Sequence, residues 1–259
     1  MNYGLNLAAS GAMTSLYRMD VLSNNLANIS TPGFKADVPA IQQRDAERIE
    51  DRLPFLPSNR MLEALGGGVF AAANRVGFEQ GAPNQTGNPL DLALQGDGFF
   101  VLQDESDRGR EALRLTRDGR FTRDSGGRLV SSTSGLPVLD ASNSPITVAD
   151  TSPVQILRDG TVMQAGEEVA RIQIMSVAAQ ESLVKVGRSM FKPTAAQLAS
   201  AQPGSASVLQ RYVEGSSVDP VLAMTEMMRA QRTVEANASM LQTHDRLSDR
   251  AINGLGRVA

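Results

Sequence analysis

The chain has 259 residues, enough for one large domain or two smaller ones with hydrophobic cores of their own. It contains no cysteine, which excludes disulfides, thiolate zinc sites and cysteine nucleophiles. Its 25 basic and 28 acidic residues nearly balance, so a charged surface for nucleic acid or an anionic membrane is not expected. The single histidine, His244, lies among charged residues and is interpreted as a solvated surface side chain.

The N-terminal segment is predicted to form one long amphipathic helix, from about Asn2 to Ile29. Its apolar residues recur every seven positions, with others at intervening positions of the same stripe: Leu5, Ala12, Met19 and Leu26, then Ala8, Leu22 and Ile29. A seven-residue repeat presents a narrow seam to a partner helix. Pro32 and Gly33 end the helix, because proline disfavours the α conformation in the preceding residue and glycine permits a tight turn.

Three asparagines, Asn24, Asn25 and Asn28, lie near the end of this helix, where their amides compete for backbone hydrogen bonds. One interpretation is a frayed last turn. The other, which we favour, is that the amides form hydrogen bonds across a helix–helix contact and fix its register, as a polar residue in a seam can.

Residues 34–75 are predicted to form an irregular connecting segment. The segment contains three prolines, and its charges alternate in sign between Asp45 and Arg52, so a short solvated helix is the alternative there. The run from Gly66 to Gly68 lacks the flanking residues of a phosphate-binding loop and is interpreted as a flexible joint.

Residues 76–190 are predicted to form a mainly antiparallel β domain. Strand-like runs alternate with glycine-containing turns at spacings of roughly 8–12 residues, which is typical of an antiparallel sandwich or barrel. The longest run extends from Val169 to Val177. Asp97, Asp118, Asp124 and Asp159 are interpreted as hairpin turn residues, because they lie next to or near glycines and lack the ligand spacing of a calcium-binding EF-hand loop.

Residues 191–215 are rich in Ala, Ser, Pro and Gln and are predicted to be a linker. A second long helix follows, from Pro220, a favourable first residue after the Asp219 cap, to about Asn253. Its apolar stripe also repeats every seven residues, with flanking alanines: Met227, Val234 and Leu241, then Ala223, Ala230 and Ala238.

The sequence therefore predicts a multi-domain α+β protein. Residues 1–33 and 216–259 are expected to pair as a discontinuous, coiled-coil-like assembly domain around the central β domain. Stable membrane insertion is not expected, because no apolar run approaches the ~20 residues of a spanning helix, and no cleaved signal peptide is recognisable. No catalytic, cofactor-binding or metal-binding residue is predicted. The predicted assembly interface comprises Leu5, Ala12, Met19, Leu22, Asn24, Asn25, Leu26, Asn28, Ile29, Val218, Met227, Val234 and Leu241.

Several motifs, in order along nearly the whole chain, resemble those of the bacterial flagellar rod and hook proteins. They are Ser23–Lys35, Leu90–Phe100, Leu115–Phe121 with Gly127–Val130, Val213–Pro220 and Met227–Arg232. The segments Met19–Val21 and Asp249–Val258 are more similar to proximal-rod than to distal-rod members. The chain departs from the family pattern at Ser217, where asparagine is typical, and at Thr233-Val234, where an aromatic residue is typical.

The resemblance implies an axial, non-enzymatic subunit of the periplasm-spanning rod in the flagellar basal body. Such a subunit is exported through the flagellar type III export apparatus without a cleaved signal peptide. Its terminal helices polymerise helically with copies of itself and with other rod and hook axial proteins, and so carry torque towards the hook. No cofactor and no nucleic-acid partner are implied.

Three alternatives remain open. The chain resembles distal-rod and hook members as well as proximal-rod members. The β domain alone is compatible with a cell-wall-acting glycosidase that uses two of Asp97, Asp118 and Asp124, provided their carboxyl groups lie about 5–10 Å apart. A free-standing adhesin or binding module on the same fold is the third alternative.

Overall fold

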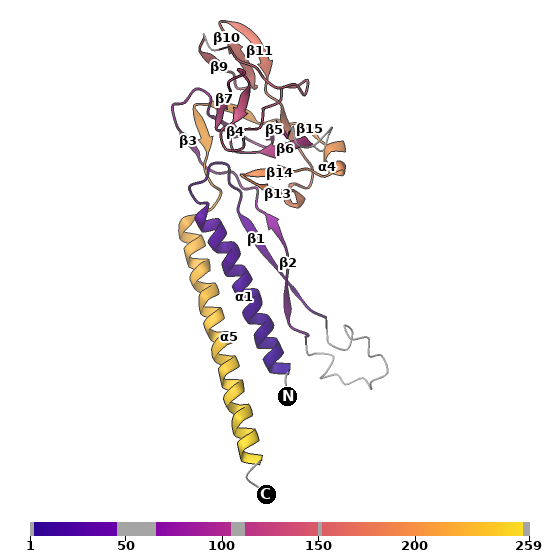
Figure 1. Cartoon of the computed structure of the whole chain (residues 1–259), viewed down its shortest axis with the longest axis vertical. Coiled ribbons are helices and arrows are strands. Elements are labelled where there is room, and N and C mark those ends of the chain that lie inside the picture. Colours follow the sequence, from indigo (N-terminus) through magenta and orange to yellow (C-terminus); the bar gives the residue numbers. More distant parts are fainter. Residues whose placement is uncertain (1–2, 46–65, 105–111, 150–151, 256–259) are drawn as a thin grey trace. The chain divides into compact units, whose positions relative to one another are not determined.

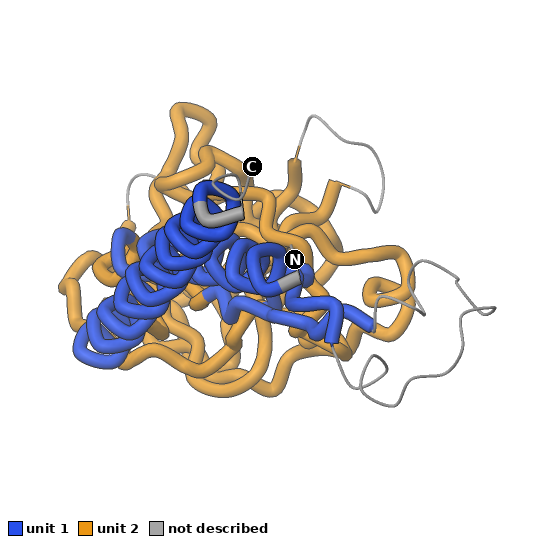
Figure 2. The backbone as a smooth tube through the Cα atoms, turned by 90° about the horizontal axis from the view of Figure 1, so that it is seen from below, with its two compact units in different colours: residues 1–27, 37–75, 219–259 blue, residues 28–36, 76–218 orange. Residues whose placement is uncertain are grey.

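The computed structural model describes residues 3–45, 66–104, 112–149 and 152–255. The chain forms two compact units, each built from separate stretches of sequence (Figure 1; Figure 2). We call residues 1–27, 37–75 and 219–259 the helical unit, and residues 28–36 and 76–218 the β unit. The chain therefore passes between the two units four times.

The helical unit contains two long helices that lie side by side, α1 (Tyr3–Ala27) and α5 (Pro220–Leu255). The predicted cap of α5 is confirmed: the Asp219 carboxylate accepts hydrogen bonds from the backbone N–H groups of Val221 (2.8 Å) and Leu222 (3.0 Å). These bonds satisfy two of the N–H groups that have no partner inside the helix, and Pro220 occupies the first helical position.

A two-stranded sheet, β1 (Asp37–Gln43) and β2 (Val69–Val76), occupies part of the segment that was expected to be irregular. Its two strands are far apart in sequence, so no local turn signal indicates their pairing. β1 also packs against α1. The short helix considered between Asp45 and Arg52 lies almost wholly outside the described residues.

The largest sheet of the β unit has six strands in the order β13-β14-β6-β5-β12-β15. All its neighbouring strands pair antiparallel. Its strands are β5 (Phe99–Gln103), β6 (Leu113–Thr116), β12 (Ile174–Ser176), β13 (Val184–Gly187), β14 (Met190–Lys192) and β15 (Gln202–Pro203).

Two hydrophobic cores lie on opposite faces of β5, because successive side chains of a strand point to opposite sides. Phe100 and Leu102 pack into one core with Leu92, Phe121 and others. Phe99 and Val101 pack into the second core, which includes Leu115, Leu183 and Phe191. The rings of Phe78, Phe99 and Phe191 lie 5.2–5.9 Å apart, so aromatic contacts tie the second core together.

Smaller sheets complete the β unit, again with antiparallel pairing. They are β3 (Pro83–Gln85) with β17 (Tyr212–Glu214), β4 (Leu92–Gln95) with β16 (Ser207–Gln210), β7 (Phe121–Arg123) with β8 (Leu129–Ser131), and β9 (Val154–Ile156) with β10 (Thr161–Gln164) and β11 (Glu167–Arg171). The short helices η2 (Gln180–Ser182) and α4 (Ala195–Ala199) lie between later strands.

Three local expectations differ from the structure. The segment 191–215 is not a linker throughout, because it holds α4, β15, β16 and β17. The run Val169–Val177 is divided between β11 and β12, which belong to different sheets. The Asp124 and Asp159 turns close hairpins, whereas Asp97 and Asp118 lie in connections between strands of different sheets.

Candidate functional site: a helix seam and a buried junction

The α1–α5 contact in the helical unit is a regular seam. Among the described side chains from Met228 to Asn253, five are not exposed: Ala230, Val234, Asn237, Leu241 and His244. Their spacings alternate between four and three residues, so they form one stripe along α5. Ala230, Val234 and Leu241 of the predicted repeat therefore lie in this stripe, whereas Ala238 is exposed and Asn237 and His244 occupy the stripe instead.

Glycines on α1 let the two helices approach closely. A Cβ atom on Gly4 would lie 2.8 Å from His244 Nε2, and one on Gly11 would lie 3.3 Å from Asn237 Nδ2. Seven residues further along, Arg18 forms an ion pair with Glu226. His244 is therefore partly buried against α1, which corrects its interpretation as a solvated surface residue.

The predicted interface residues on α1 lie beside the centre of this seam. Leu22 is buried, while Leu5, Ala12, Met19 and Leu26 are partly buried. Each of these four lies one position after a residue of the series Gly4, Gly11, Arg18 and Asn25. The sequence did not indicate that the centre of the contact lies at these earlier positions, because glycine is a poor helix former and does not by itself mark a helix–helix seam. On α5, Met227, Val234 and Leu241 are partly buried, as the repeat predicts.

The three asparagines near the end of α1 do not share one role. Asn25 is buried. Its side-chain amide donates a hydrogen bond to the Asp37 carbonyl (2.8 Å) and accepts one from the Asp37 N–H (2.9 Å). Asn25 therefore connects α1 to β1 and not to a second helix of this chain. Asn28 accepts a hydrogen bond from the Thr31 hydroxyl (3.2 Å). Asn24 is exposed. Asn28, Ile29 and Val218 lie in the β unit and are partly buried.

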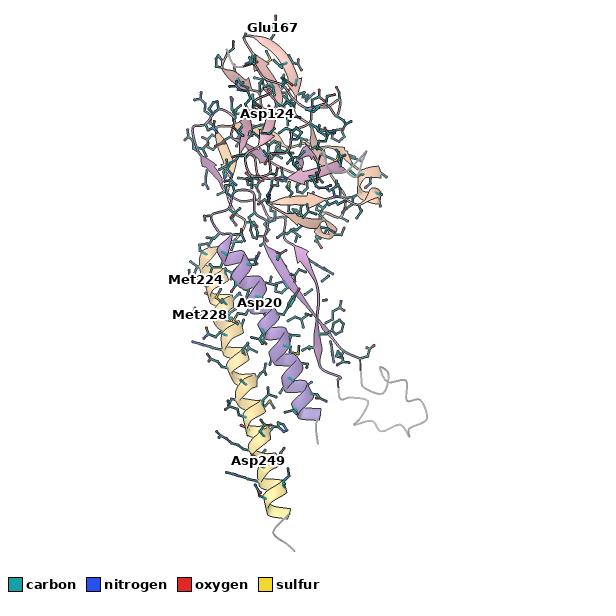
Figure 3. All side chains as sticks on the ribbon, in the orientation of Figure 1. Asp20, Asp124, Glu167, Met224, Met228 and Asp249 are labelled. Atoms are coloured by element: carbon teal, nitrogen blue, oxygen red, sulfur yellow. The ribbon has the colours of Figure 1, made fainter. Side chains whose placement is uncertain are left out.

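Large apolar side chains remain exposed on both helices, among them Met224 and Met228 of α5 (Figure 3). The most exposed are Val221 at 72% and Met13 at 71%, and the others include Leu7, Leu16, Leu222, Met224, Met228, Met240, Leu247 and Ile252. Apolar surface on this scale is typical of a face that a protein partner covers.

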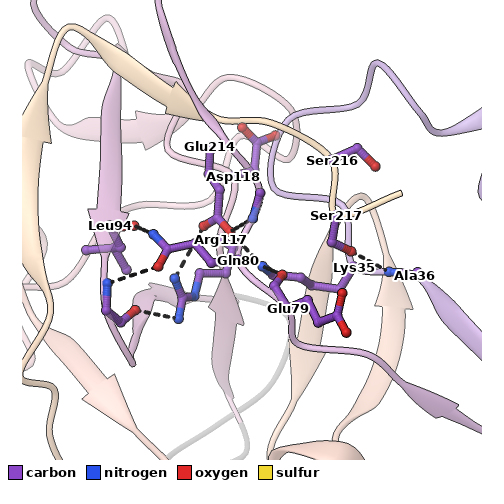
Figure 4. A network of polar contacts seen from close by, with 12 residues as sticks. Lys35, Ala36, Glu79, Gln80, Leu94, Arg117, Asp118, Glu214, Ser216 and Ser217 are labelled. Atoms are coloured by element: carbon purple, nitrogen blue, oxygen red, sulfur yellow. Dashed lines mark hydrogen bonds and ion pairs between the residues drawn. The ribbon is translucent and has the colours of Figure 1, made fainter. Parts of the chain in front are cut away.

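A second cluster, in the β unit, is a buried junction formed by Lys35, Arg117 and Glu214 (Figure 4). The Glu214 carboxylate accepts hydrogen bonds from Lys35 Nζ (2.6 Å), from Arg117 Nη1 (3.3 Å) and from the Gly81 N–H (3.0 Å). The exposed fractions of the three charged side chains are 0%, 4% and 1%. Lys35 also donates to the Glu79 carbonyl (2.7 Å). One carboxylate therefore balances two buried cations.

Backbone hydrogen bonds join the same segments around this junction. Gly33 N–H donates to the Glu214 carbonyl (2.8 Å), and Ser217 N–H donates to the Phe34 carbonyl (3.1 Å). Ser217 Oγ accepts from the Ala36 N–H (3.0 Å), so the serine that replaces the family's usual asparagine supplies a side-chain acceptor. A Cβ on Gly33, which has a φ of +65°, would overlap the backbone of Arg117.

The junction unites the motifs on which the family resemblance depends. Lys35 comes from the first motif, Arg117 from the third and Glu214 from the C-terminal one, while Arg117 Nη2 donates to the Gly96 carbonyl (2.9 Å) in the second. Sequence analysis did not predict this cluster. The available signal was a set of charged residues inside otherwise apolar or glycine-rich motifs.

Two of the three aspartates of the glycosidase alternative, Asp118 and Asp124, serve local structure, and the third, Asp97, is exposed. The Asp118 carboxylate accepts hydrogen bonds from Arg120 and Thr133, and the Asp124 carboxylate accepts them from Gly126 and Arg128. The Arg128 hydrogen bond is the main reason that the pKa of Asp124 lies below its ordinary value. In the part of the chain that the structure describes, no group of three or more acidic or histidine side chains is placed to hold a metal ion, and no helix is long and apolar enough to cross a membrane.

Burial of Lys35 lowers its pKa below the ordinary value of 10.5, although the Glu214 carboxylate opposes the shift. Between the lowered pKa and 10.5 the unfolded chain binds more protons than the folded chain, so the free energy of unfolding rises with pH in that window. We expect the wild type to gain stability relative to Lys35→Met as the pH rises to about 10.5. Urea unfolding of both proteins across that range measures this, and a falling difference contradicts it.

Comparisons with known proteins cover both clusters. Residues 5–35 match the family described as flagella basal body rod protein, residues 93–164 match the flagellar hook protein FlgE/F/G D1 domain, and residues 209–254 match the C-terminal region of the flagellar basal body rod FlgEFG proteins.

Full-length relatives show the same relationship. The flagellar basal-body rod protein FlgG of Caulobacter vibrioides is 32% identical, over 94% of this chain and 95% of that protein. FlgF of the same organism is 32% identical over 100% of both chains. FlgF of Mesorhizobium japonicum is 30% identical over 99% of both.

Proposed function

Because this chain belongs to the flagellar basal-body rod protein family, with the FlgF and FlgG proteins, we propose that it is a structural subunit of the rod. The observation that carries the proposal is the pair of terminal helices, which form one seam and still expose large apolar residues on their outer faces. A helix exposes such residues at a cost, and burial against neighbouring subunits removes that cost.

In this proposal the predicted interface residues on α5 stabilise the helix pair. Seam residues such as Met227, Val234 and Leu241 order α5 against α1 in a coiled-coil-like pair, and the outer faces then bind copies of the chain and other rod and hook proteins. The polar seam residues Arg18, Asn237 and His244 set the register, a role first considered for Asn24, Asn25 and Asn28. Because unlike surfaces meet, growth is open and helical.

We propose further that the chain is a proximal-rod, FlgF-type subunit, on the segments Met19–Val21 and Asp249–Val258. The distal-rod, FlgG-type role is the alternative, since relatives of both kinds are 32% identical to the chain. As an axial subunit it transmits torque, leaves the cytoplasm through the flagellar export apparatus and catalyses no reaction.

A deletion strain that produces residues 28–259 in place of the full chain tests the proposal. This boundary retains Gly33 and Lys35, which belong to the β unit. We expect a folded β unit, no incorporation into purified basal bodies, and no motility. An adhesin or enzyme keeps its activity without α1, so normal swimming in this strain contradicts the rod proposal.

A further inference from the structure

The buried junction joins parts of the β unit that are far apart in sequence. Lys35 and Glu214 are separated by 179 positions, yet their side chains meet at 2.6 Å in the unit's interior. The segment 33–36 and the segment 214–217 are further joined by three hydrogen bonds of 2.8–3.1 Å.

Removing Glu214 from this arrangement removes the one carboxylate that binds both buried cations, and only the weaker attraction of exposed Glu79 for Lys35 remains. A buried charge without a bound partner is strongly unfavourable, so without Glu214 either the site opens or Lys35 loses its proton, and each of these costs free energy. Arg117 is already incompletely satisfied, because its Nε atom is buried without a hydrogen-bond partner. The site therefore depends on the C-terminal segment for its charge balance.

Strand pairing gives an independent reason for the same dependence. Within the described residues, β3 pairs with β17 and β4 pairs with β16, each pair as a separate two-stranded sheet. Leu92 and Leu94 of β4 are fully buried in the first core together with Val208 of β16. Without residues 207–214, β3 and β4 have no strand partner and the first core is open on that side.

We infer that the Lys35–Arg117–Glu214 junction is a closure latch, which makes folding of the β unit conditional on both its first and its last segment. Glu214 neutralises the cations, and it is also the last residue of β17, the strand that pairs with β3. A chain made from its N-terminus keeps this unit open until Glu214 is available. This inference concerns the isolated chain and does not depend on assembly into a rod.

Native-state hydrogen exchange of the full chain tests the latch. In the wild type, the N–H groups of Gly33, Gly81 and Gly215 and those of β3 and β4 should open together as one cooperative unit. In Glu214→Gln, the exchange rates of this whole set should rise about 100-fold or more, because both cations lose their counter-charge. Exchange that rises only in residues next to position 214 overturns the inference.

Glu79→Gln is the matched control. Glu79 is exposed, and Lys35 bonds to its backbone carbonyl, which the substitution retains. The same chemical change a short distance away should therefore leave exchange of the set within about threefold of the wild type. An equal rise in both variants overturns the inference, since general electrostatics then explains it.

Ser217→Ala tests the latch inference if Glu214→Gln does not fold. It removes the Oγ acceptor for the Ala36 N–H and leaves all three charges in place. The latch predicts that exchange of Gly33, Gly81 and Gly215 rises together by about tenfold. A rise confined to Ala36 overturns the inference.

Discussion

Replacing Ala8 with aspartate (Ala8→Asp) is expected to separate α1 from α5 and to abolish incorporation into the rod. Ala8 is 5% exposed and lies on the same face of α1 as Gly4 and Gly11, which contact α5. A carboxylate buried there without a partner costs several kcal/mol. Most of the stability of a helix in a protein comes from the packing of its apolar face, so α1 loses most of its stability when this contact is lost.

The measurement is hydrogen exchange of α1 in the purified chain, followed by motility of the strain. Protection along residues 3–27 should be lost, while the six-stranded sheet keeps its protection. Asn6→Asp is the matched control, because it places the same side chain on an exposed position of the same helix turn. Retained α1 protection in Ala8→Asp contradicts the proposed seam.

Replacing Gly119 with alanine (Gly119→Ala) is expected to destabilise the β unit by about 3 kcal/mol. A Cβ at this position would overlap the Leu92 carbonyl group and lie 3.2 Å from the Phe100 ring. Leu92 cannot move freely, because it is fully buried and its N–H donates to the Gly119 carbonyl (2.9 Å). The clash is therefore with backbone, which yields less readily than a flexible side chain.

Thermal unfolding of the β unit measures this effect. A loss of this size lowers the Tm by roughly 6–12 °C. Gly126→Ala is the control: its Cβ would meet only Asp124, at an ordinary 3.4 Å, so its Tm should stay within about 3 °C of the wild type. Equal Tm values for Gly119→Ala and the wild type contradict this packing.

The position of the C-terminal helix and the antiparallel character of the β unit could be predicted from local sequence patterns. The repeat of Met227, Val234 and Leu241 coincides with partly buried positions of α5, and Asp219-Pro220 predicted the start of this helix. The antiparallel character of the β unit followed from alternating runs and turns.

Contacts between distant segments were not predictable in this way. Gly4 and Gly11 mark the centre of the seam only because His244 and Asn237 lie opposite them. The β1–β2 pairing and the strands within 191–215 depend on partners far along the chain. Lys35, assigned to an irregular connection, is completely buried because Glu214, 179 positions away, supplies its counter-charge. No local pattern encodes these pairings.

The central claim is that the outer faces of the terminal helices bind neighbouring subunits in the rod. The chain has no cysteine, so a single introduced cysteine, labelled with a photoreactive maleimide cross-linker, reports one position. Met13→Cys places it on an exposed position of α1. Met228→Cys places it on α5 and Glu167→Cys on an exposed strand of the β unit, and both positions are labelled in Figure 3. We predict intersubunit cross-links in purified basal bodies for Met13→Cys and Met228→Cys. Cross-links at Glu167→Cys alone, with both helix positions unreacted in assembled rods, would contradict the claim.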